Sequence, residues 1–163
     1  MNSRFETAKT QFIKCCVDQP RYRVAWLIGK PLSGKSKLAQ ELSTILNWHY
    51  INYTTTLGYF DSLRLTIASY QPLDFIKAIQ SWCMNTQSEV LILDEIDALL
   101  ACWSNDQRRV WISQIARLTG LPCGLILVSH LVDYTVLGAY IPDNDGRYVV
   151  QLGEDNESIT TKL

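Results

Sequence analysis

The sequence predicts an α/β fold, a three-layer sandwich built on a five-stranded, mainly parallel sheet. Two features lead to this prediction. Short, continuous apolar runs recur along the chain, and segments with helical spacing of apolar residues lie between them. A continuous apolar run indicates a strand that is buried on both faces, and a parallel sheet needs helices on both sides to bury it.

Each expected element follows from its local pattern. Strands are expected at residues 24–28, 48–53, 90–93, 125–128 and 148–152. Helices are expected where apolar side chains recur every three or four positions, at residues 5–17, 35–46, 59–70, 72–84 and 106–119. Pro20 should end the first helix and Pro72 should begin the fourth. On the last helix the apolar face is expected to comprise Val110, Trp111, Ile115 and Leu118.

Composition narrows the class of protein. The 163 residues favour one domain, and 47% hydrophobic residues exclude a disordered chain. The net charge of −1 gives no general attraction to nucleic acid, although a local basic patch is compatible with it. No apolar run approaches the roughly 18 residues of a membrane helix, and residues 1–6 lack the apolar core of a signal peptide. The five cysteines contain no C-x-x-C pair. We therefore expect a cytoplasmic protein with reduced thiols and no membrane partner.

Residues 29–36 read Gly-Lys-Pro-Leu-Ser-Gly-Lys-Ser, a complete G-x-x-x-x-G-K-[ST] phosphate loop between a predicted strand and a predicted helix. Gly29 and Gly34 allow the backbone to turn so that successive N–H groups face a phosphate. The Lys35 ammonium is expected at the β- and γ-phosphates of ATP, and the Ser36 hydroxyl on Mg²⁺. The motif predicts ATP and Mg²⁺ as cofactors and these nucleotide-binding residues: Gly29, Lys30, Pro31, Leu32, Ser33, Gly34, Lys35, Ser36 and Lys37.

A second pattern consists of the apolar residues 90–93 followed by Asp94 and Glu95. A buried strand delivers its last residues to the carboxyl edge of the sheet, where open α/β folds bind ligands. We therefore expect Asp94 to join Ser36 as a ligand of Mg²⁺, as in a Walker B element. Glu95 is then placed to polarise a water molecule for attack on the γ-phosphate. Asp97 fits either a supporting position behind these acids or the plain surface.

The order of these elements over residues 20–152 resembles the core of AAA+ and related STAND ATPases. The helical lid of typical AAA+ proteins has no counterpart in the sequence after the fifth strand. We expect one domain over residues 1–163, with a helix at 5–17, the nucleotide core at 20–152 and a frayed tail at 153–163.

A narrower resemblance rests on the compact length, on Tyr50-Ile51-Asn52-Tyr53 and on residues 93–100, which read Leu-Asp-Glu-Ile-Asp-Ala-Leu-Leu. These features resemble the small P-loop ATPase subunit (BrxF-type) of bacterial BREX phage-defence systems. The chain departs from that family in the phosphate loop, where Lys-Pro-Leu-Ser replaces Pro-Pro-Gly-Ser, and in the stretch after Ser129.

The AAA+ resemblance implies roles for two further residues. Ser129 matches the polar position after the fourth strand that senses the γ-phosphate in that family. Arg147, just before the last strand, matches the position of the arginine finger that enters the site of an adjacent subunit, with Arg108 and Arg109 as the alternative. His130 is expected to be a surface or capping histidine.

Together these patterns predict an ATPase subunit that acts as an assembly or switch component of a larger machine. The BREX resemblance implies phage defence, with a nucleotide-dependent homo-oligomer, other subunits of a defence complex and double-stranded DNA as candidate partners. Two alternatives stay open: a small P-loop kinase that phosphorylates a metabolite, and a nucleotide-gated binding module with negligible hydrolysis. The sequence has no N-K-x-D motif, which argues against a GTPase.

Overall fold

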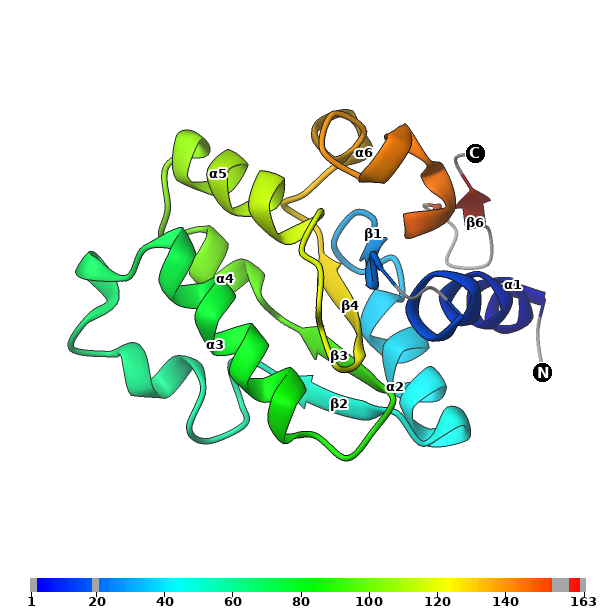
Figure 1. Cartoon of the computed structure of the whole chain (residues 1–163), viewed down its shortest axis with the longest axis horizontal. Coiled ribbons are helices and arrows are strands. Elements are labelled where there is room, and N and C mark those ends of the chain that lie inside the picture. The colour runs from blue at the N-terminus through cyan, green and yellow to red at the C-terminus, as the bar shows by residue number, and fades with distance from the viewer. Residues whose placement is uncertain (1–2, 19–20, 154–158, 162–163) are drawn as a thin grey trace.

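A computed structural model describes residues 3–18, 21–153 and 159–161 of the chain (Figure 1). Its centre is a sheet with the strand order β2-β3-β4-β1-β5-β6. Five strands run parallel to one another: β1 (Val24–Ile28), β2 (His49–Asn52), β3 (Val90–Asp94), β4 (Gly124–Ser129) and β5 (Val149–Leu152). The short strand β6 (Ile159–Thr161) pairs antiparallel with β5 at one edge.

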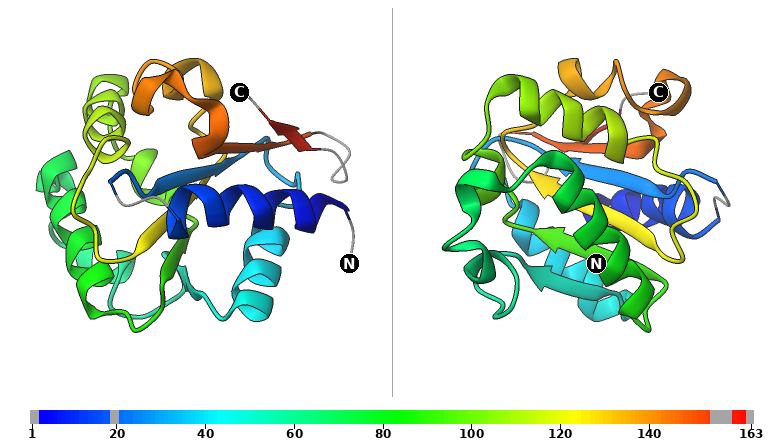
Figure 2. Two further views of the ribbon diagram at one scale, coloured as in Figure 1. Left: turned by 45° about the vertical axis from the view of Figure 1, so that its right-hand side comes forward. Right: turned by 60° about the vertical axis from the view of Figure 1, so that its left-hand side comes forward.

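Helices cover both faces of this sheet, as Figure 2 shows. One face carries α1 (Ser3–Phe12), which continues as a π-helical turn at Ile13–Val17, and α2 (Lys35–Leu46). The other face carries α3 (Pro72–Asn85) and α5 (Asn105–Ile115), which pack against each other. Helix α2 lies on one face and α3 and α5 on the other because connections between parallel strands are right-handed. The chain runs from β1 to β2 at the edge of the sheet in one direction, and it returns through β3 and β4 in the opposite direction. The short helices α4 (Asp97–Leu100) and α6 (Tyr134–Leu137) follow β3 and β4.

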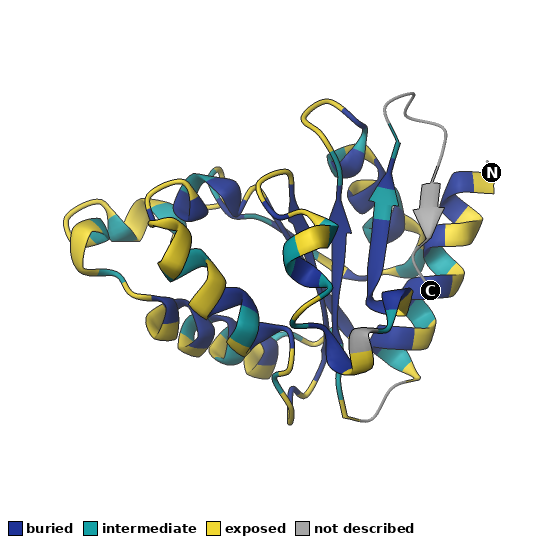
Figure 3. Ribbon diagram, turned by 90° about the horizontal axis from the view of Figure 1, so that it is seen from above, coloured by how far each residue is buried: buried dark blue, intermediate teal, exposed yellow. Residues whose placement is uncertain are grey.

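The predicted α/β class and parallel sheet are confirmed, and the helical cover is compatible with a three-layer sandwich. The first strand and the second helix have the predicted bounds. Strands β1, β3 and β4 are buried along their whole length, and dark blue strands are visible in Figure 3, whereas β2 is only partly buried, with His49 exposed. Aromatic rings fill the layer between the sheet and α3 and α5, where Phe75 stacks on Trp111 at 5.3 Å and Trp26 meets Trp111 edge-on at 5.7 Å.

The helix predicted at residues 59–70 is wrong. The segment forms two 3₁₀ turns, at Phe60–Leu63 and Ile67–Ser69. The hydroxyls of Ser62 and Ser69 donate to backbone carbonyls three residues earlier, at 2.6 and 3.0 Å, and such bonds compete with a continuous α-helix. The apolar spacing that suggested a helix places its side chains only half inside the core, and Leu65 is almost fully exposed.

Several bounds and one segment of the tail also differ from the predictions. Helix α5 ends at Ile115 rather than at residue 119, and its buried face includes Ile112 while Val110 is 47% exposed. Residues 159–161 form a strand where a frayed tail was expected. The expected stop at Pro20 and residues 154–158 and 162–163 of the tail lie outside the described residues. Further 3₁₀ turns at Pro142–Asn144 and Gly146–Tyr148 lead into β5.

Four of the five cysteines are buried, and all five are free thiols. Within residues 3–18, 21–153 and 159–161, every helix is too short or too polar to cross a bilayer.

Candidate functional site

The shared direction of the parallel strands β1, β3 and β4 brings the sequence motifs that follow them to one edge of the sheet. Strand β4 lies between β1 and β3, with Ile28 opposite Ser129 and Leu127 opposite Leu93. The three strands are parallel, so the phosphate loop after β1, Ser129 at the end of β4 and Asp94 at the end of β3 share the carboxyl edge. Open α/β sheets bind ligands at this edge.

A cleft of about 460 Å³ opens at this edge. Its walls come from the phosphate loop and the start of α2, from the segment after β3, and from the end of β4. The lining residues are Pro31, Leu32, Gly34, Lys35, Ser36, Lys37, Asp94, Glu95, Asp97, Val128 and His130. The two strongest motifs of the sequence therefore meet in one cavity.

Glycine is required at both ends of the phosphate loop. Gly29 has φ +155°, and a Cβ there would lie 2.8 Å from Ser33 Oγ and 3.1 Å from the carbonyl oxygen of Leu152. Gly34 has φ +92° at the position just before α2. Leu32 also has a positive φ of +63°, and 94% of the residue is exposed. The loop thus curls tightly enough to point the first N–H groups of α2 toward the cleft.

The side chain of Lys35 is buried, with 8% of the residue exposed. Its ammonium donates to the carbonyl oxygens of Gly29 at 3.0 Å and Lys30 at 2.7 Å, and to Ser33 Oγ at 3.3 Å. Burial lowers the pKa of Lys35, while the acids Asp97, Asp94 and Glu95 act in the opposite direction. The charge is therefore held over the loop by its own carbonyl groups and by acids across the cleft.

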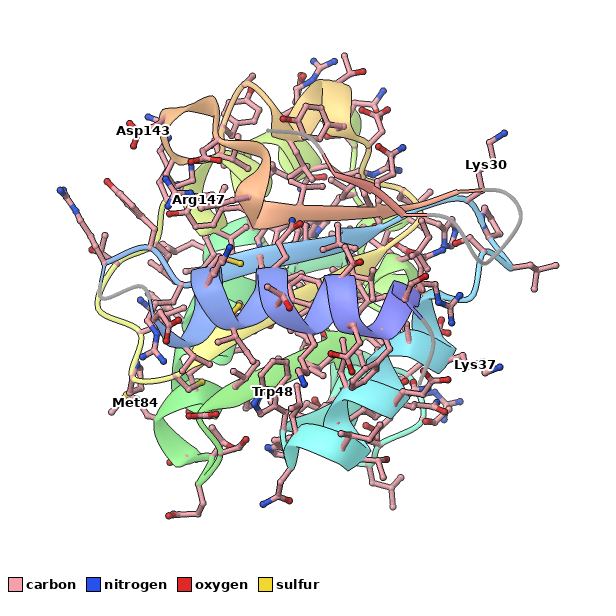
Figure 4. All side chains as sticks on the ribbon, turned by 90° about the vertical axis from the view of Figure 1, so that its right-hand side faces the viewer. Lys30, Lys37, Trp48, Met84, Asp143 and Arg147 are labelled. Carbon is pink, nitrogen blue, oxygen red and sulfur yellow. The ribbon has the colours of Figure 1, made fainter. Side chains whose placement is uncertain are left out.

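The other lysines of the motif behave differently. Lys30 and Lys37 are exposed, and Figure 4 shows both projecting outward at the same end of the molecule. Of these two, only Lys37 lines the cleft. Ser33 is 2% exposed and lies inside the loop, where it supports the Lys35 ammonium.

Asp94 is fixed from two sides at the end of β3. It is 3% exposed, and its Oδ1 accepts a hydrogen bond from the backbone N–H of Glu95 at 2.8 Å. Its Oδ2 accepts one from the Tyr50 hydroxyl at 2.6 Å. Burial, together with this hydrogen bond, raises the pKa of Tyr50 above its usual value. Sequence reasoning missed the contact, since Tyr50 belongs to β2 and meets Asp94 only when β2 pairs with β3.

Glu95 lies on the cleft and is exposed to solvent. Its backbone adopts φ +63°, a conformation that residues other than glycine rarely take and that often marks functional sites. The N–H bonded to Asp94 Oδ1 holds this turn. The carboxylate of Glu95 is thus accessible to a ligand or to water.

Ser129 lies behind the cleft wall. It is 1% exposed and does not line the cavity. Its hydroxyl donates to Asp97 Oδ1 at 2.5 Å and accepts from the N–H groups of Leu131 and Val132 at 3.1 and 3.2 Å. Asp97 is itself buried and lines the cleft, so it does not lie on the plain surface. His130, expected as a surface or capping residue, is exposed and also lines the cleft.

The structure places Arg147 away from this site. It precedes β5, which runs parallel to β1, and so lies at the amino edge of the sheet, whereas the phosphate loop follows the carboxyl end of β1. Figure 4 shows Arg147 and Lys30 at opposite ends. Asp145 binds the Arg147 guanidinium, and its Oδ1 accepts from the Arg147 backbone N–H at 3.0 Å. Hydrogen bonding to Asp145 raises the pKa of Arg147.

The alternative arginines lie on α5. Arg108 donates through Nε to the carbonyl oxygen of Leu100 at 2.7 Å, and Arg109 pairs with Asp106 at 3.6 Å. Neither lines the cleft. Comparison of the sequence with protein-family models and with curated proteins gives no match.

Proposed function

We propose that this chain is a P-loop ATPase with an AAA+-like core, which binds ATP with Mg²⁺ and hydrolyses it. The observation that carries the proposal is the meeting of the phosphate loop, Asp94 and Glu95 in one cleft of about 460 Å³. Loop N–H groups and the start of α2 supply donors for phosphate oxygens, and Lys35 supplies the charge for the β- and γ-phosphates.

Ser36 and Asp94 would hold the Mg²⁺ ion. Both line the cleft, and both offer the hard oxygen donors that Mg²⁺ prefers. Each Asp94 oxygen accepts one hydrogen bond and keeps a further lone pair for a ligand. The described part of the chain has no group of three or more His, Cys, Asp or Glu side chains suited to a metal. Mg²⁺ needs none, since it takes one or two protein ligands beside water and phosphate oxygens. When bound, it would neutralise phosphate charge.

Glu95 is the proposed general base, because its exposed carboxylate lies on the cleft. No arginine occurs among the described residues that line the cleft. Phosphoryl transfer to water is accelerated strongly by an arginine finger, so the finger would come from a neighbouring molecule. Arg147 of a second copy is our candidate, and the chain would hydrolyse ATP efficiently only when assembled.

This dependence on a neighbour supports a role as an assembly or switch subunit. In line with the BREX resemblance, we propose a cytoplasmic phage-defence complex with further subunits and with double-stranded DNA as a candidate ligand. The missing arginine equally favours a second candidate function, a nucleotide-gated binding module with negligible hydrolysis of its own.

Calorimetry with ATP, with and without Mg²⁺, tests binding, and phosphate release at increasing protein concentration tests hydrolysis. We expect Mg²⁺-dependent binding and a turnover per chain that rises with protein concentration. Absence of ATP binding at millimolar nucleotide would refute the ATPase proposal. Binding without turnover at any protein concentration, with or without DNA, would favour the binding module.

A further inference from the structure

Tyr50 and Asp94 project from neighbouring strands to the same face of the sheet. Tyr50 lies opposite Ile92 in the pairing of β2 with β3, and Asp94 is two residues beyond Ile92 on the same strand. Residues opposite each other in a parallel pair share a face, and so do residues two apart on one strand. Tyr50 is half-buried and does not line the cleft. Its hydroxyl therefore reaches Asp94 from beside the cleft.

Helix α2 covers this face and packs against both strands. Its residue Gln40 donates through Nε2 to the Tyr50 hydroxyl at 3.5 Å. Gln40 follows Ser36 by four residues, and side chains at this spacing lie on one side of a helix. The Tyr50 hydroxyl thus bridges Asp94 on β3 and the side of α2 that carries Ser36. Asp94 and Ser36 are the two proposed ligands of Mg²⁺.

The two hydrogen bonds to the Asp94 carboxylate fix its orientation. Oδ2 accepts from the Tyr50 hydroxyl at 2.6 Å, and Oδ1 accepts from the backbone N–H of Glu95 at 2.8 Å. A bond to one oxygen leaves a carboxylate free to turn about its Cβ–Cγ bond, whereas bonds to both oxygens define its plane. Asp94 is buried, so water is not at hand to replace a lost donor. The orientation of the carboxylate therefore depends on the Tyr50 hydroxyl.

We propose that Tyr50 is a positioning residue for the metal site, whose hydroxyl holds the Asp94 carboxylate in the orientation that binds Mg²⁺ beside ATP. The inference rests on the proposed ATPase function and deepens it. Groups that hydrogen-bond to a metal ligand orient that ligand, and their loss typically lowers metal affinity by about 10- to 100-fold.

An opposing effect has to be weighed against this orientation. The hydroxyl draws charge from Oδ2, and its removal would by that effect alone make Mg²⁺ bind more tightly. Orientation outweighs this effect, because Mg²⁺ demands near-ideal octahedral geometry and the bond to Oδ1 alone lets the carboxylate turn. Loss of the Tyr50 hydroxyl should therefore weaken the binding of Mg²⁺.

The metal dependence of nucleotide binding tests this role. The affinity for a non-hydrolysable ATP analogue is measured by calorimetry in EDTA and in saturating Mg²⁺, for the wild type, Tyr50→Phe and Tyr22→Phe. In Tyr50→Phe we expect the gain in affinity from Mg²⁺ to fall by about tenfold or more, while the affinity in EDTA stays within about twofold. Tyr22→Phe is the matched control, because it removes the hydroxyl of another half-buried tyrosine, just before β1, and should change neither value.

A merely structural role of Tyr50 gives a different result. Tyr50→Phe would then unfold at a lower urea concentration but keep the wild-type gain from Mg²⁺, and that outcome would overturn the proposal. A larger gain from Mg²⁺ in Tyr50→Phe would also overturn it, because the hydroxyl would then be holding Asp94 away from the ion. If the wild type binds no nucleotide at all, the ATPase proposal itself fails, and this inference fails with it.

A second cation separates orientation of the carboxylate from its charge. Ca²⁺ accepts oxygen ligands in a flexible geometry, unlike Mg²⁺, so a misplaced carboxylate should weaken Ca²⁺ less. In the same titrations with Ca²⁺ we expect the gain in affinity for Tyr50→Phe to stay within about threefold of the wild-type gain. Equal losses with Mg²⁺ and Ca²⁺ would contradict a role in orienting Asp94.

Discussion

Replacing Lys35 with alanine should remove ATP binding while leaving the fold intact. In the free protein the ammonium donates three hydrogen bonds, to the carbonyl oxygens of Gly29 and Lys30 and to Ser33 Oγ. Lys30 is exposed, so water can reach the loop once the side chain is shortened. We expect the free energy of unfolding to change by no more than about 1–2 kcal/mol.

The effect on the ligand should be larger. Lys35 is the only lysine of the cleft whose ammonium is held over the loop, and each charge-assisted hydrogen bond to phosphate contributes roughly 1.5–3 kcal/mol. Two such bonds correspond to a loss of at least about a hundredfold in ATP affinity. Calorimetry with Mg²⁺ and ATP measures it, circular dichroism and urea unfolding verify the fold, and Lys77→Ala on the exposed side of α3 is the control. A folded Lys35→Ala with wild-type affinity would refute the phosphate-loop assignment.

Three further substitutions test other parts of the site. Glu95→Gln should bind ATP normally yet hydrolyse it at least about tenfold more slowly, and a full rate in phosphate release would remove Glu95 as the base. Tyr50→Phe should lower the free energy of unfolding by about 1 kcal/mol in urea titrations, since the half-buried hydrogen bond to Asp94 is lost; unchanged stability would mean that this bond contributes nothing. Arg147→Ala should lower turnover and leave ATP affinity unchanged, whereas Arg109→Ala should change neither quantity; equal rates for the two variants in steady-state assays would assign the finger elsewhere.

Patterns within short stretches of the sequence predicted the elements whose structure is determined by residues close together in the chain. Strand β1, the phosphate loop and α2 follow one another within residues 24–46, and their observed bounds match the expected ones. A buried strand, a glycine at each end of the loop and an apolar helix face each constrain the backbone within a few residues. The same holds for the end of β3, where Asp94 and Glu95 reach the cleft directly from the strand.

The site residues that the sequence did not reveal depend on pairing between distant segments. The hydrogen bond from Tyr50 to Asp94 spans 44 positions and exists because β2 lies beside β3. Asp97 and Ser129 are 32 positions apart and meet because β3 lies beside β4. A pattern within one segment contains no information on which strands become neighbours. The family resemblance implies a phosphate contact for Ser129, whereas its buried hydroxyl donates to Asp97. Ser129 and His130 both lie at the end of β4, but only His130 is exposed, and only His130 lines the cleft.

The positions of the cleft and of Arg147 restrict how copies of the chain could assemble. Because β1 and β5 are parallel, the phosphate loop and Arg147 lie at opposite edges of one sheet. A two-fold dimer buries the same patch on both subunits, and no single patch contains both edges. If Arg147 is the finger, one copy must therefore present its amino edge to the carboxyl edge of the next, which is a head-to-tail contact. Such contacts generate rings or open helices, with every copy acting both as an activator and as a substrate-binding subunit. The terminal phosphate would strengthen this contact, because it is the group that the neighbour's arginine would meet.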